Sequence, residues 1–285
     1  MTTLAIGFFD GVHLGHQAIL RGADLAVTFR NHPLSVLAPS RSPKLIMAPE
    51  ERIAALGAFC ARTHVIEFTP ELAVLSPYEF VDKLRRIVAA EGLCPDAISV
   101  RAGANWRFGK GGAGDAQWLR SHGFDATVVP FAEYCGKTVS STRIRAAIAA
   151  GRMPDASAML GREFAVSGRV VSGKGLGRSL GFPTLNIHPD PISGAERIEP
   201  PKGVYAVSVA GARAVANFGV APTLGAQRWR EATWEVHLLE PAALPGPGCE
   251  MRFGVRRFLR AERKFGGIDE LKLQIAADCV EAQCD

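Results

Sequence analysis

The sequence predicts an α/β unit followed by a small antiparallel β-barrel that a final helix caps. From residue 1 to about 150, short apolar runs alternate with helical patterns, which is typical of a doubly wound, Rossmann-like parallel sheet. After Gly151, short strand-like runs follow one another between Gly and Pro turns without a helical pattern, which favours a barrel. A boundary among residues 153–162 divides the chain into domains of 1–158 and 159–285.

Five apolar runs in the first half are the expected strands: 4–6, 25–29, 65–68, 97–100 and 126–129. One helix between them is well marked. Pro49 lies in its first turn, acidic residues follow, and apolar residues recur at Ile53, Leu56 and Phe59 as far as Cys60.

In the second half, the expected strands are 164–166, 169–171, 204–209, 214–218 and 233–239. A final helix from Ile268 to Val280 places Ile268, Leu271, Ile275 and Val280 near one stripe, which suffices to cover a barrel end.

The composition is that of an ordinary globular protein. Of the 285 residues, 47% are hydrophobic and 21% charged, and the net charge of +5 is spread evenly, without a basic block. This distribution suits small anions such as nucleotides and argues against a nucleic-acid partner. No apolar run has transmembrane length and the N-terminus has no signal-peptide pattern, so we expect no membrane partner and a cytoplasmic location. The six cysteines form no C-x-x-C pair, which predicts reduced thiols and no zinc site.

A glycine-rich turn follows the first expected strand, at residues 7–16. Gly7, Gly11 and Gly15 allow backbone N–H groups to approach a ligand, and a helix start adds its positive dipole end. His13 and His16, three residues apart, point to one side of that helix start. This pattern suits a nucleoside triphosphate that loses pyrophosphate. Two alternatives stay open: a tight turn without a ligand, and a hydrolase metal site, for which the spacing supplies no third ligand.

Two further motifs lie in the first half. Residues 140–145, Ser-Ser-Thr-Arg-Ile-Arg, place hydroxyls where they can cap a helix and arginines where they can reach phosphates. Residues 103–109 form a glycine-flanked loop with an aromatic pair and one cation, which by itself indicates a mobile surface loop.

Residues 168–175 fit G-x-x-x-x-G-K, but the Ser or Thr that would hold Mg²⁺ is missing. We expect no helix after this motif, because Gly177, Gly181 and Pro183 interrupt the chain. It is therefore not a Walker A loop, although a different glycine-rich nucleotide flap remains possible.

Alternation along two expected strands places polar residues in pairs. Thr184 and Asn186 share one face, where they can help to hold Mg²⁺ and orient phosphates. Glu235 and His237 share one face of another strand, opposite Trp234 and its apolar neighbours. A carboxylate on a rigid strand suits a general base. The alternative is that both pairs are the polar outer faces of antiparallel strands.

These motifs, in this order, resemble the bacterial bifunctional riboflavin kinase/FAD synthetase family over nearly the whole chain. They are GFFDGVHLGH at 7–16, HP at 32–33, WRFG at 106–109, SSTRIR at 140–145, LGFPTLN at 180–186, GVYAV at 203–207, WEVHLL at 234–239, FLR at 258–260 and KF at 264–265.

The resemblance implies a nucleotidyltransferase domain that moves AMP from ATP to FMN, releasing pyrophosphate. It also implies a six-stranded barrel kinase that phosphorylates riboflavin, with Mg²⁺ and ATP in both reactions. Glu235 would accept the hydroxyl proton in the kinase, and His13 and His16 would stabilise charge on the α-phosphate in the transferase. The implied partners are ATP, riboflavin, FMN and FAD, and the protein is expected to be a monomer or weak homo-oligomer.

The remaining site residues are also carried over by motif. ATP and phosphate binding is expected at Gly7, Phe9, Asp10, Gly11, Gly15, Ser141, Thr142, Arg143, Gly173, Lys174, Gly177, Pro183 and Asn186. Flavin binding is expected at Asn105, Trp106, Arg107, Phe108, Arg260 and Phe265, and Mg²⁺ at Thr184 and Asn186.

The chain departs from the family pattern mainly in its first half. Phe8 stands where the family usually has Asn or Thr, and Arg30 stands in place of an acid before His32-Pro33. Glycines at 111 and 112 replace a basic residue, the interval from His16 to the second strand is short, and Ala221 differs in the second half. These departures motivate an alternative, a monofunctional riboflavin kinase whose first domain is a degenerate nucleotide- or flavin-binding scaffold or regulator.

Overall fold

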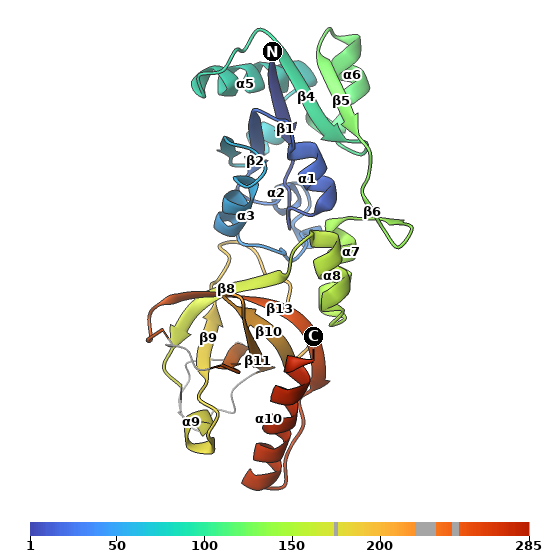
Figure 1. Ribbon diagram of the computed structural model, residues 1–285. Helices are drawn as coiled ribbons and strands as arrows, with labels where there is room; N and C mark the ends of the chain where they lie inside the picture. The colour runs from blue at the N-terminus through green and yellow to red at the C-terminus, as the bar shows by residue number, and fades with distance from the viewer. Residues whose placement is uncertain (174–175, 220–231, 241–244, 285) are drawn as a thin grey trace. The chain divides into compact units, whose positions relative to one another are not determined.

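The computed structural model describes residues 1–285 except 174–175, 220–231, 241–244 and 285. The chain forms two compact units. The first comprises Met1–Arg143 and Ile192–Arg197, and the second comprises Ile144–Pro191 and Ile198–Asp285 (Figure 1). The predicted fold class is confirmed, because the first unit is built on a parallel sheet and the second on a closed antiparallel barrel.

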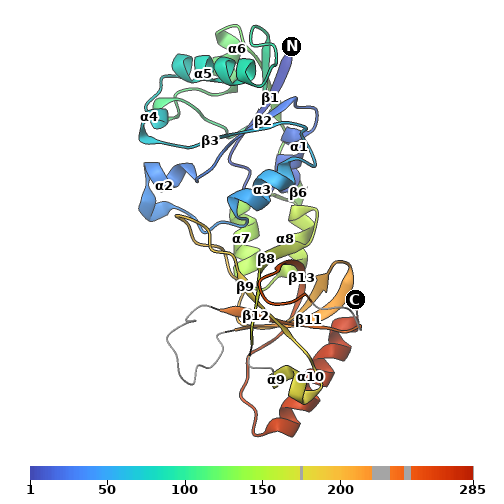
Figure 2. The same ribbon diagram turned by 90° about the vertical axis from the view of Figure 1, so that its left-hand side faces the viewer.

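The sheet of the first unit has five parallel strands in the order β3-β2-β1-β4-β5. They are β1 (Thr2–Ile6), β2 (Leu25–Phe29), β3 (Thr63–Ile66), β4 (Ile98–Gly103) and β5 (Asp125–Val129). The strand order reverses at β1, where Ala5 pairs with Ala26 of β2 on one side and Arg101 of β4 on the other. Ligands of such sheets bind beyond the carboxyl ends of the strands at this reversal, which is where the turn after β1 lies (Figure 2).

The helices of the first unit lie between these strands. They are α1 (Leu14–Leu20), α2 (Pro33–Leu37), α3 (Pro49–Leu56), α4 (Pro70–Ala73), α5 (Pro77–Ala90) and α6 (Ala116–Ser121), with 3-10 turns η1 (Pro39–Arg41) and η2 (Lys110–Gly112). A short hairpin of β6 (Glu133–Tyr134) and β7 (Lys137–Thr138) precedes α7 (Ser141–Ala149). The core contains Leu4, Val27 and Val100 of the sheet with Phe80 and Leu84 of α5.

Two predicted elements of the first unit end earlier in the structure than predicted. The helix expected as far as Cys60 ends at Leu56, because Gly57 follows as its C-cap. The strand expected at 65–68 is β3, which ends at Ile66. The chain leaves the sheet there because the Asn31 side chain, rather than a neighbouring strand, bonds the backbone of Phe68. It donates to the Phe68 carbonyl oxygen and accepts from the Phe68 N–H.

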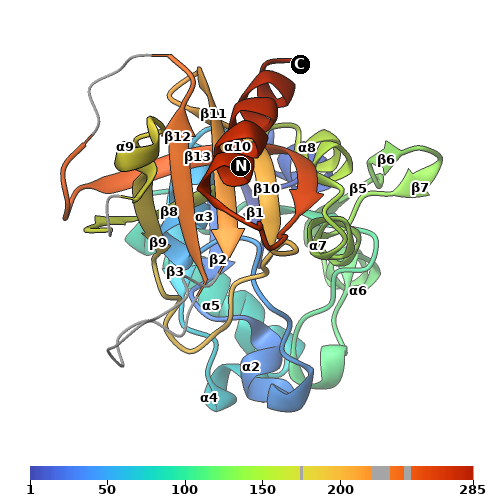
Figure 3. The same ribbon diagram turned by 90° about the horizontal axis from the view of Figure 1, so that it is seen from below.

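The barrel of the second unit closes in the order β10-β11-β12-β9-β8-β13. Its strands are β8 (Phe164–Val171), β9 (Leu185–Pro189), β10 (Gly203–Val209), β11 (Ala212–Gly219), β12 (Thr233–Leu238) and β13 (Glu250–Ala261), and all adjacent pairs are antiparallel (Figure 3). Trp234 fills the interior, with its ring stacked on Phe218 at 4.5 Å between centroids and close to Tyr205 and Phe253.

Three strand or helix predictions for the second unit are wrong. The two strands expected at 164–166 and 169–171 form the single strand β8, because Gly168 is extended rather than a turn. The strand β13 was not expected, since Arg252, Arg256 and Arg257 interrupt its apolar residues. A short helix, α9 (Leu176–Leu180), follows the G-x-x-x-x-G-K motif where we expected none.

The final helix was predicted correctly, but its buried face was not. α10 spans Ile268–Gln283, while Ile268 and Val280 are 62% and 63% exposed. The covered face contains Leu271, Ile275 and Ala282, and it includes Asp278 because this carboxylate pairs with an arginine of the barrel. The second unit also contains α8 (Met153–Leu160), which packs on β8 and β13.

Gly168 provides a test of how tightly β8 packs on β9. A Cβ at this position would lie 2.3 Å from the carbonyl oxygen of His188, so Gly168→Ala forces the two strands apart. We expect the substitution to lower the free energy of unfolding by about 1–3 kcal/mol in urea or thermal unfolding. Gly246→Ala is the matched control, because nothing lies within 4 Å of its added Cβ. Equal stability of the two variants would contradict this account of β8.

Candidate functional sites

The turn between β1 and α1 is held rigidly by a buried carboxylate. Asp10, only 2% exposed, accepts hydrogen bonds from the backbone N–H groups of Ile46 at 3.1 Å and Met47 at 3.3 Å. The Ser141 hydroxyl donates to the Asp10 carbonyl oxygen at 2.9 Å. Phe9 and Val12 take left-handed φ angles of 57° and 41°, which non-glycine residues adopt only where the surroundings enforce them.

His13 and His16 lie together at the start of α1. His13 is the N-cap, and its Nδ1 accepts from the His16 N–H at 3.3 Å. The two rings stack with centroids 3.5 Å apart and an interplanar angle of 18°. A Cβ on Gly15 would lie 3.3 Å from the His13 ring, so glycine leaves room for this arrangement. The sequence prediction that the two imidazoles share one side is confirmed.

The electrostatic surroundings keep His16 neutral. Burial of its ring lowers the pKa of His16 well below the ordinary value, and the nearby charges of His13 and Arg52 lower it further. Its Nδ1 is buried and has no hydrogen-bond partner in the described part of the chain. A neutral imidazole with an unused ring nitrogen can form a hydrogen bond to a phosphate oxygen. No group of three or more potential metal-ligating residues occurs among the described residues.

The motif at the start of α7 supports the turn and the neighbouring hairpin. Ser140 accepts from the Arg143 N–H at 3.2 Å, which is the predicted helix cap. The Arg143 guanidinium donates to the carbonyl oxygens of Lys137, Thr138 and Tyr134 at 2.7–3.0 Å. In this conformation Arg143 therefore holds the hairpin, whereas the Thr142 side chain is exposed.

The loop after β4 carries one buried and one partly exposed aromatic ring. Phe108 is 6% exposed and packs in the core against Phe80 and Trp118. Trp106 stacks on Phe108, with centroids 4.7 Å apart, and is partly exposed. Asn105 and Arg107 are exposed. Trp106 is therefore the aromatic ring of this loop that can still meet a ligand.

A cavity of about 600 Å³ in the second unit collects several predicted residues. Its wall contains Gly177, Thr184, Glu235, Arg260 and Phe265, together with Asn217, His237, Glu262, Leu271 and Ile275. Asn186 pairs in register with Glu235 across β9 and β12. The predicted faces are confirmed for β12, where Glu235 and His237 line the cavity and Trp234 and Val236 are buried in the barrel.

Two glycines bring the segment after β8 close to the polar pair on β9. A Cβ on Gly173 would lie 2.0 Å from Nδ2 of Asn186, and one on Gly177 would lie 3.0 Å from Oγ1 of Thr184. The close approach of this segment to Thr184 and Asn186 is the geometry expected of a glycine-rich flap. Lys174, predicted for this flap, and Ala221 lie outside the described residues.

Glu235 is a partly buried carboxylate with a charged neighbour. Burial raises the pKa of Glu235, and the negative charge of Glu262 raises it further. His237, two residues along the strand, forms a hydrogen bond from Nδ1 to the Pro183 carbonyl oxygen at 2.8 Å. A carboxylate with a raised pKa is a stronger base once ionised.

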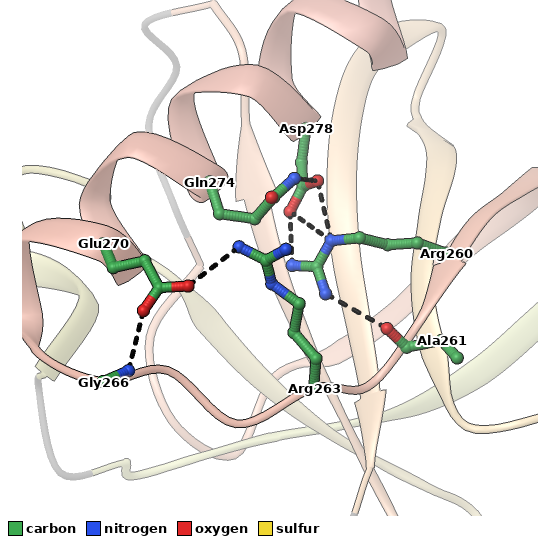
Figure 4. A network of polar contacts seen from close by, with 7 residues as sticks. All are labelled: Arg260, Ala261, Arg263, Gly266, Glu270, Gln274 and Asp278. Atoms are coloured by element: carbon green, nitrogen blue, oxygen red, sulfur yellow. Dashed lines mark hydrogen bonds and ion pairs between the residues drawn. The ribbon is translucent and has the colours of Figure 1, made fainter.

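An ion pair ties the end of β13 to α10 (Figure 4). Arg260 donates to both carboxylate oxygens of Asp278, from Nε at 2.9 Å and from Nη2 at 2.7 Å, and Gln274 donates to the same carboxylate at 2.8 Å. Arg263 pairs with Glu270, which also accepts from the Gly266 N–H. Arg260, predicted to bind flavin, thus uses its guanidinium to hold α10.

Sequence reasoning missed Asp278 and Glu262 in this cavity, Gln274 beside Asp278, and Arg52 near the histidines. Asp278 lies seven residues after Leu271 and four after Gln274, so its helical spacing was a usable signal. Arg52 follows two glutamates in the sequence, a pattern that ordinarily indicates a solvated helix face.

The Arg260–Asp278 pair provides a second test. Arg260→Met leaves the Asp278 carboxylate, with its side chain 3% exposed, without its cation. Removing one partner of a buried ion pair costs about 3–5 kcal/mol of unfolding free energy. Arg169→Met is the matched control, because its pair with Glu250 is exposed at 62% and 78%, and we expect at most about 1 kcal/mol. Unfolding curves in urea distinguish the two, and similar losses would contradict the assignment.

A Rossmann-like unit with paired histidines at its switch point, joined to a closed barrel with a carboxylate in its cavity, defines a two-domain nucleotide-dependent transferase. The FAD synthetase family model matches residues 1–143, and the riboflavin kinase model matches residues 160–284. The chain belongs to the bifunctional riboflavin kinase/FMN adenylyltransferase family.

Individual relatives are similar over nearly their whole length. The bifunctional riboflavin kinase/FMN adenylyltransferase of Escherichia coli (strain K12) is 35% identical, with 98% of this chain and 91% of the relative covered. The protein of the same name from Bacillus subtilis (strain 168) is 34% identical, with 99% and 91% covered. A crystal structure described as a macrolide-efflux protein from Streptococcus pneumoniae has a TM-score of 0.85 at 26% identity, covering 100% of this chain and 94% of that one. In the described ranges, no helix is long and apolar enough to span a bilayer.

Proposed function

We propose that this chain converts riboflavin to FMN in its second unit and FMN to FAD in its first unit, with ATP as the second substrate of each reaction. The observation that carries the proposal is that the FAD synthetase model matches residues 1–143 and the riboflavin kinase model matches residues 160–284. The monofunctional alternative is disfavoured, because the first 143 residues match the FAD synthetase model despite their departures.

Glu235 is the proposed general base of the kinase. It accepts the proton of the ribityl hydroxyl while the hydroxyl oxygen forms a bond to the γ-phosphorus of ATP and the bond to ADP breaks. The products are FMN and ADP, and the proton ends on the carboxylate. Such transfers need chiefly positioning and charge stabilisation, which the walls of the cavity supply. Asp278 and Arg260 contribute indirectly by holding α10, from which Leu271 and Ile275 enclose the flavin side.

The residues near the glycine flap fit a magnesium ion bound with ATP. Thr184 offers a hydroxyl and Asn186 an amide oxygen, both hard donors, beside glycines whose missing side chains let the chain approach these two residues closely. We assign these two residues to Mg²⁺, with Gly173, Gly177 and Pro183 near the phosphates and Phe265 beside the flavin. The ion would supply charge neutralisation for the transferred phosphoryl group.

In the first unit, a phosphate oxygen of FMN attacks the α-phosphorus of ATP, and the bond to pyrophosphate breaks. No protein group needs to take a proton. His13 and His16 donate hydrogen bonds to the charge that develops on the α-phosphate. The backbone of Gly7 to Gly15, with Ser141 and Thr142, forms the proposed phosphate site, and Trp106 is the proposed flavin contact. We place the reactions in the cytoplasm, in a monomer or weak oligomer.

One assay measures the two activities separately. Purified protein incubated with riboflavin, ATP and Mg²⁺ should yield FMN and then FAD, resolved by chromatography. Glu235→Gln should lower FMN formation from riboflavin by about 100-fold or more, because the amide cannot accept the proton, while FAD formation from FMN is unchanged. FMN without FAD from the wild type would reject the adenylyltransferase, and a fully active Glu235→Gln would reject the assigned base.

The raised pKa of Glu235 predicts the pH dependence of the kinase. Below its pKa the carboxyl is protonated and cannot act as a base, so activity falls as pH decreases through a value above the ordinary glutamate range. Glu262→Gln removes the negative charge that raises this pKa, so the acidic limb of kcat should move to lower pH. Glu250→Gln, outside the cavity, should leave the profile unchanged. An unmoved limb in Glu262→Gln would contradict the coupling of the two carboxylates.

A further inference from the structure

Phe8, the apolar residue in the glycine turn, covers a buried cation. Its ring lies over Arg52, with the guanidinium carbon 3.9 Å from the ring centroid. The ring also meets His32 edge-on, with centroids 4.6 Å apart, and packs against Leu45, Ala48 and Ile192. The side chain that replaces the family's usual Asn or Thr is therefore part of a formed contact.

Few other contacts compensate for the burial of the Arg52 charge. It is 0% exposed, and its Nη2 donates to the carbonyl oxygens of Phe29 at 2.5 Å and Arg30 at 3.1 Å, where β2 ends. Its Nε and Nη1 have no hydrogen-bond acceptor among the described residues. Burying a cation with unused donors is costly, and the negative face of an aromatic ring offsets part of that cost. Burial lowers the pKa of Arg52 to about 10, so it stays charged at neutral pH.

The two consecutive aromatic residues of the turn connect this cation with the histidines. The Phe8 ring covers Arg52, and the Phe9 ring meets His16 edge-on, with centroids 5.3 Å apart. The charge of Arg52 is one of the influences that disfavour protonation of His16. Protonation of His16 would also place a cation against the stacked His13 ring.

We propose that Phe8 and Arg52 form a positioning pair for adenylyl transfer: the aromatic face of Phe8 holds the guanidinium behind the glycine turn, and the adjacent Phe9 ring, edge-on to His16, transmits this fixed geometry to the stacked His13–His16 pair. The pair rests on the proposed adenylyltransferase function and explains how a phenylalanine is accommodated in its phosphate-binding turn. Neither residue touches a reacting atom, and both act through the histidines.

The charged groups around this pair come from several elements. Asp10 in the turn and Glu50 on α3 attract Arg52, whereas Arg30 after β2 repels it. Arg30 carries the same charge as Arg52 but is exposed, and it pairs with Glu50 at 3.6 Å. Arg30→Met is therefore a matched control for Arg52→Met.

The first experiment compares full-length Phe8→Leu, Phe8→Tyr, Arg52→Met and the Phe8→Leu/Arg52→Met double variant. Leucine keeps apolar volume but lacks the aromatic face, whereas tyrosine keeps that face. We expect FAD formation from FMN to fall about tenfold in kcat for Phe8→Leu, with KM for ATP little changed, and to stay within about twofold for Phe8→Tyr. The double variant should lose no more than Arg52→Met alone, because the same interaction is removed. Kinase activity of the same samples, expected to be unchanged, reports that the chain is folded.

The second experiment measures His16 directly, by NMR titration of ¹⁵N-labelled histidines in the full chain without substrates. Arg52→Met should move the His16 titration to higher pH, because a nearby positive charge is gone, whereas Arg30→Met should not move it. The proposal is overturned if Phe8→Leu keeps full adenylyl transfer, if Phe8→Tyr loses as much as Phe8→Leu, or if His16 titrates alike in Arg52→Met and wild type. If wild type makes no FAD at all, the proposed function fails, while the NMR titration still decides on the pair.

Discussion

A carboxylate that leaves water must find its hydrogen-bond partners inside the protein, and two such groups organise the two sites. Asp10 accepts hydrogen bonds from the N–H groups of residues 46 and 47 and thereby fixes the turn that carries the histidines. Asp278 accepts hydrogen bonds from Arg260 and Gln274 and thereby fixes the helix that lines the barrel cavity. Because an unpartnered buried charge is so costly, each contact leaves the local backbone little freedom.

The two sites use opposite electrostatics for related chemistry. In the first unit, burial and neighbouring positive charge lower the pKa of His16 and favour its neutral form, which suits the hydrogen-bonding role proposed for it. In the second unit, burial and a neighbouring negative charge raise the proton affinity of Glu235, which suits a base. The difference follows from the reactions, since a hydroxyl must lose a proton when it is phosphorylated, whereas a phosphate that attacks ATP has none to lose.

Much of the fold and part of each site were predictable from local patterns. The strand–helix alternation predicted the parallel sheet, and the strict alternation around Glu235 predicted which side chains leave the barrel core. The predictions failed where the meaning of a residue depended on a distant neighbour. Gly168 suggested a turn from the sequence, whereas in the structure it lies within a strand and leaves room for the His188 carbonyl group. The arginines of β13 interrupt its apolar residues and concealed this strand.

The sequence by itself determined the order of the elements, the glycine turn with its two histidines, the polar faces of two barrel strands and, through the order of these motifs, the family. These features are set by spacing along the chain, where backbone geometry translates sequence directly into position. Only the tertiary structure decided that Phe8 covers Arg52, that Arg143 holds a hairpin and that Arg260 holds Asp278. Each of these depends on which charge is removed from water and what lies opposite it, and that is a property of packing between distant segments.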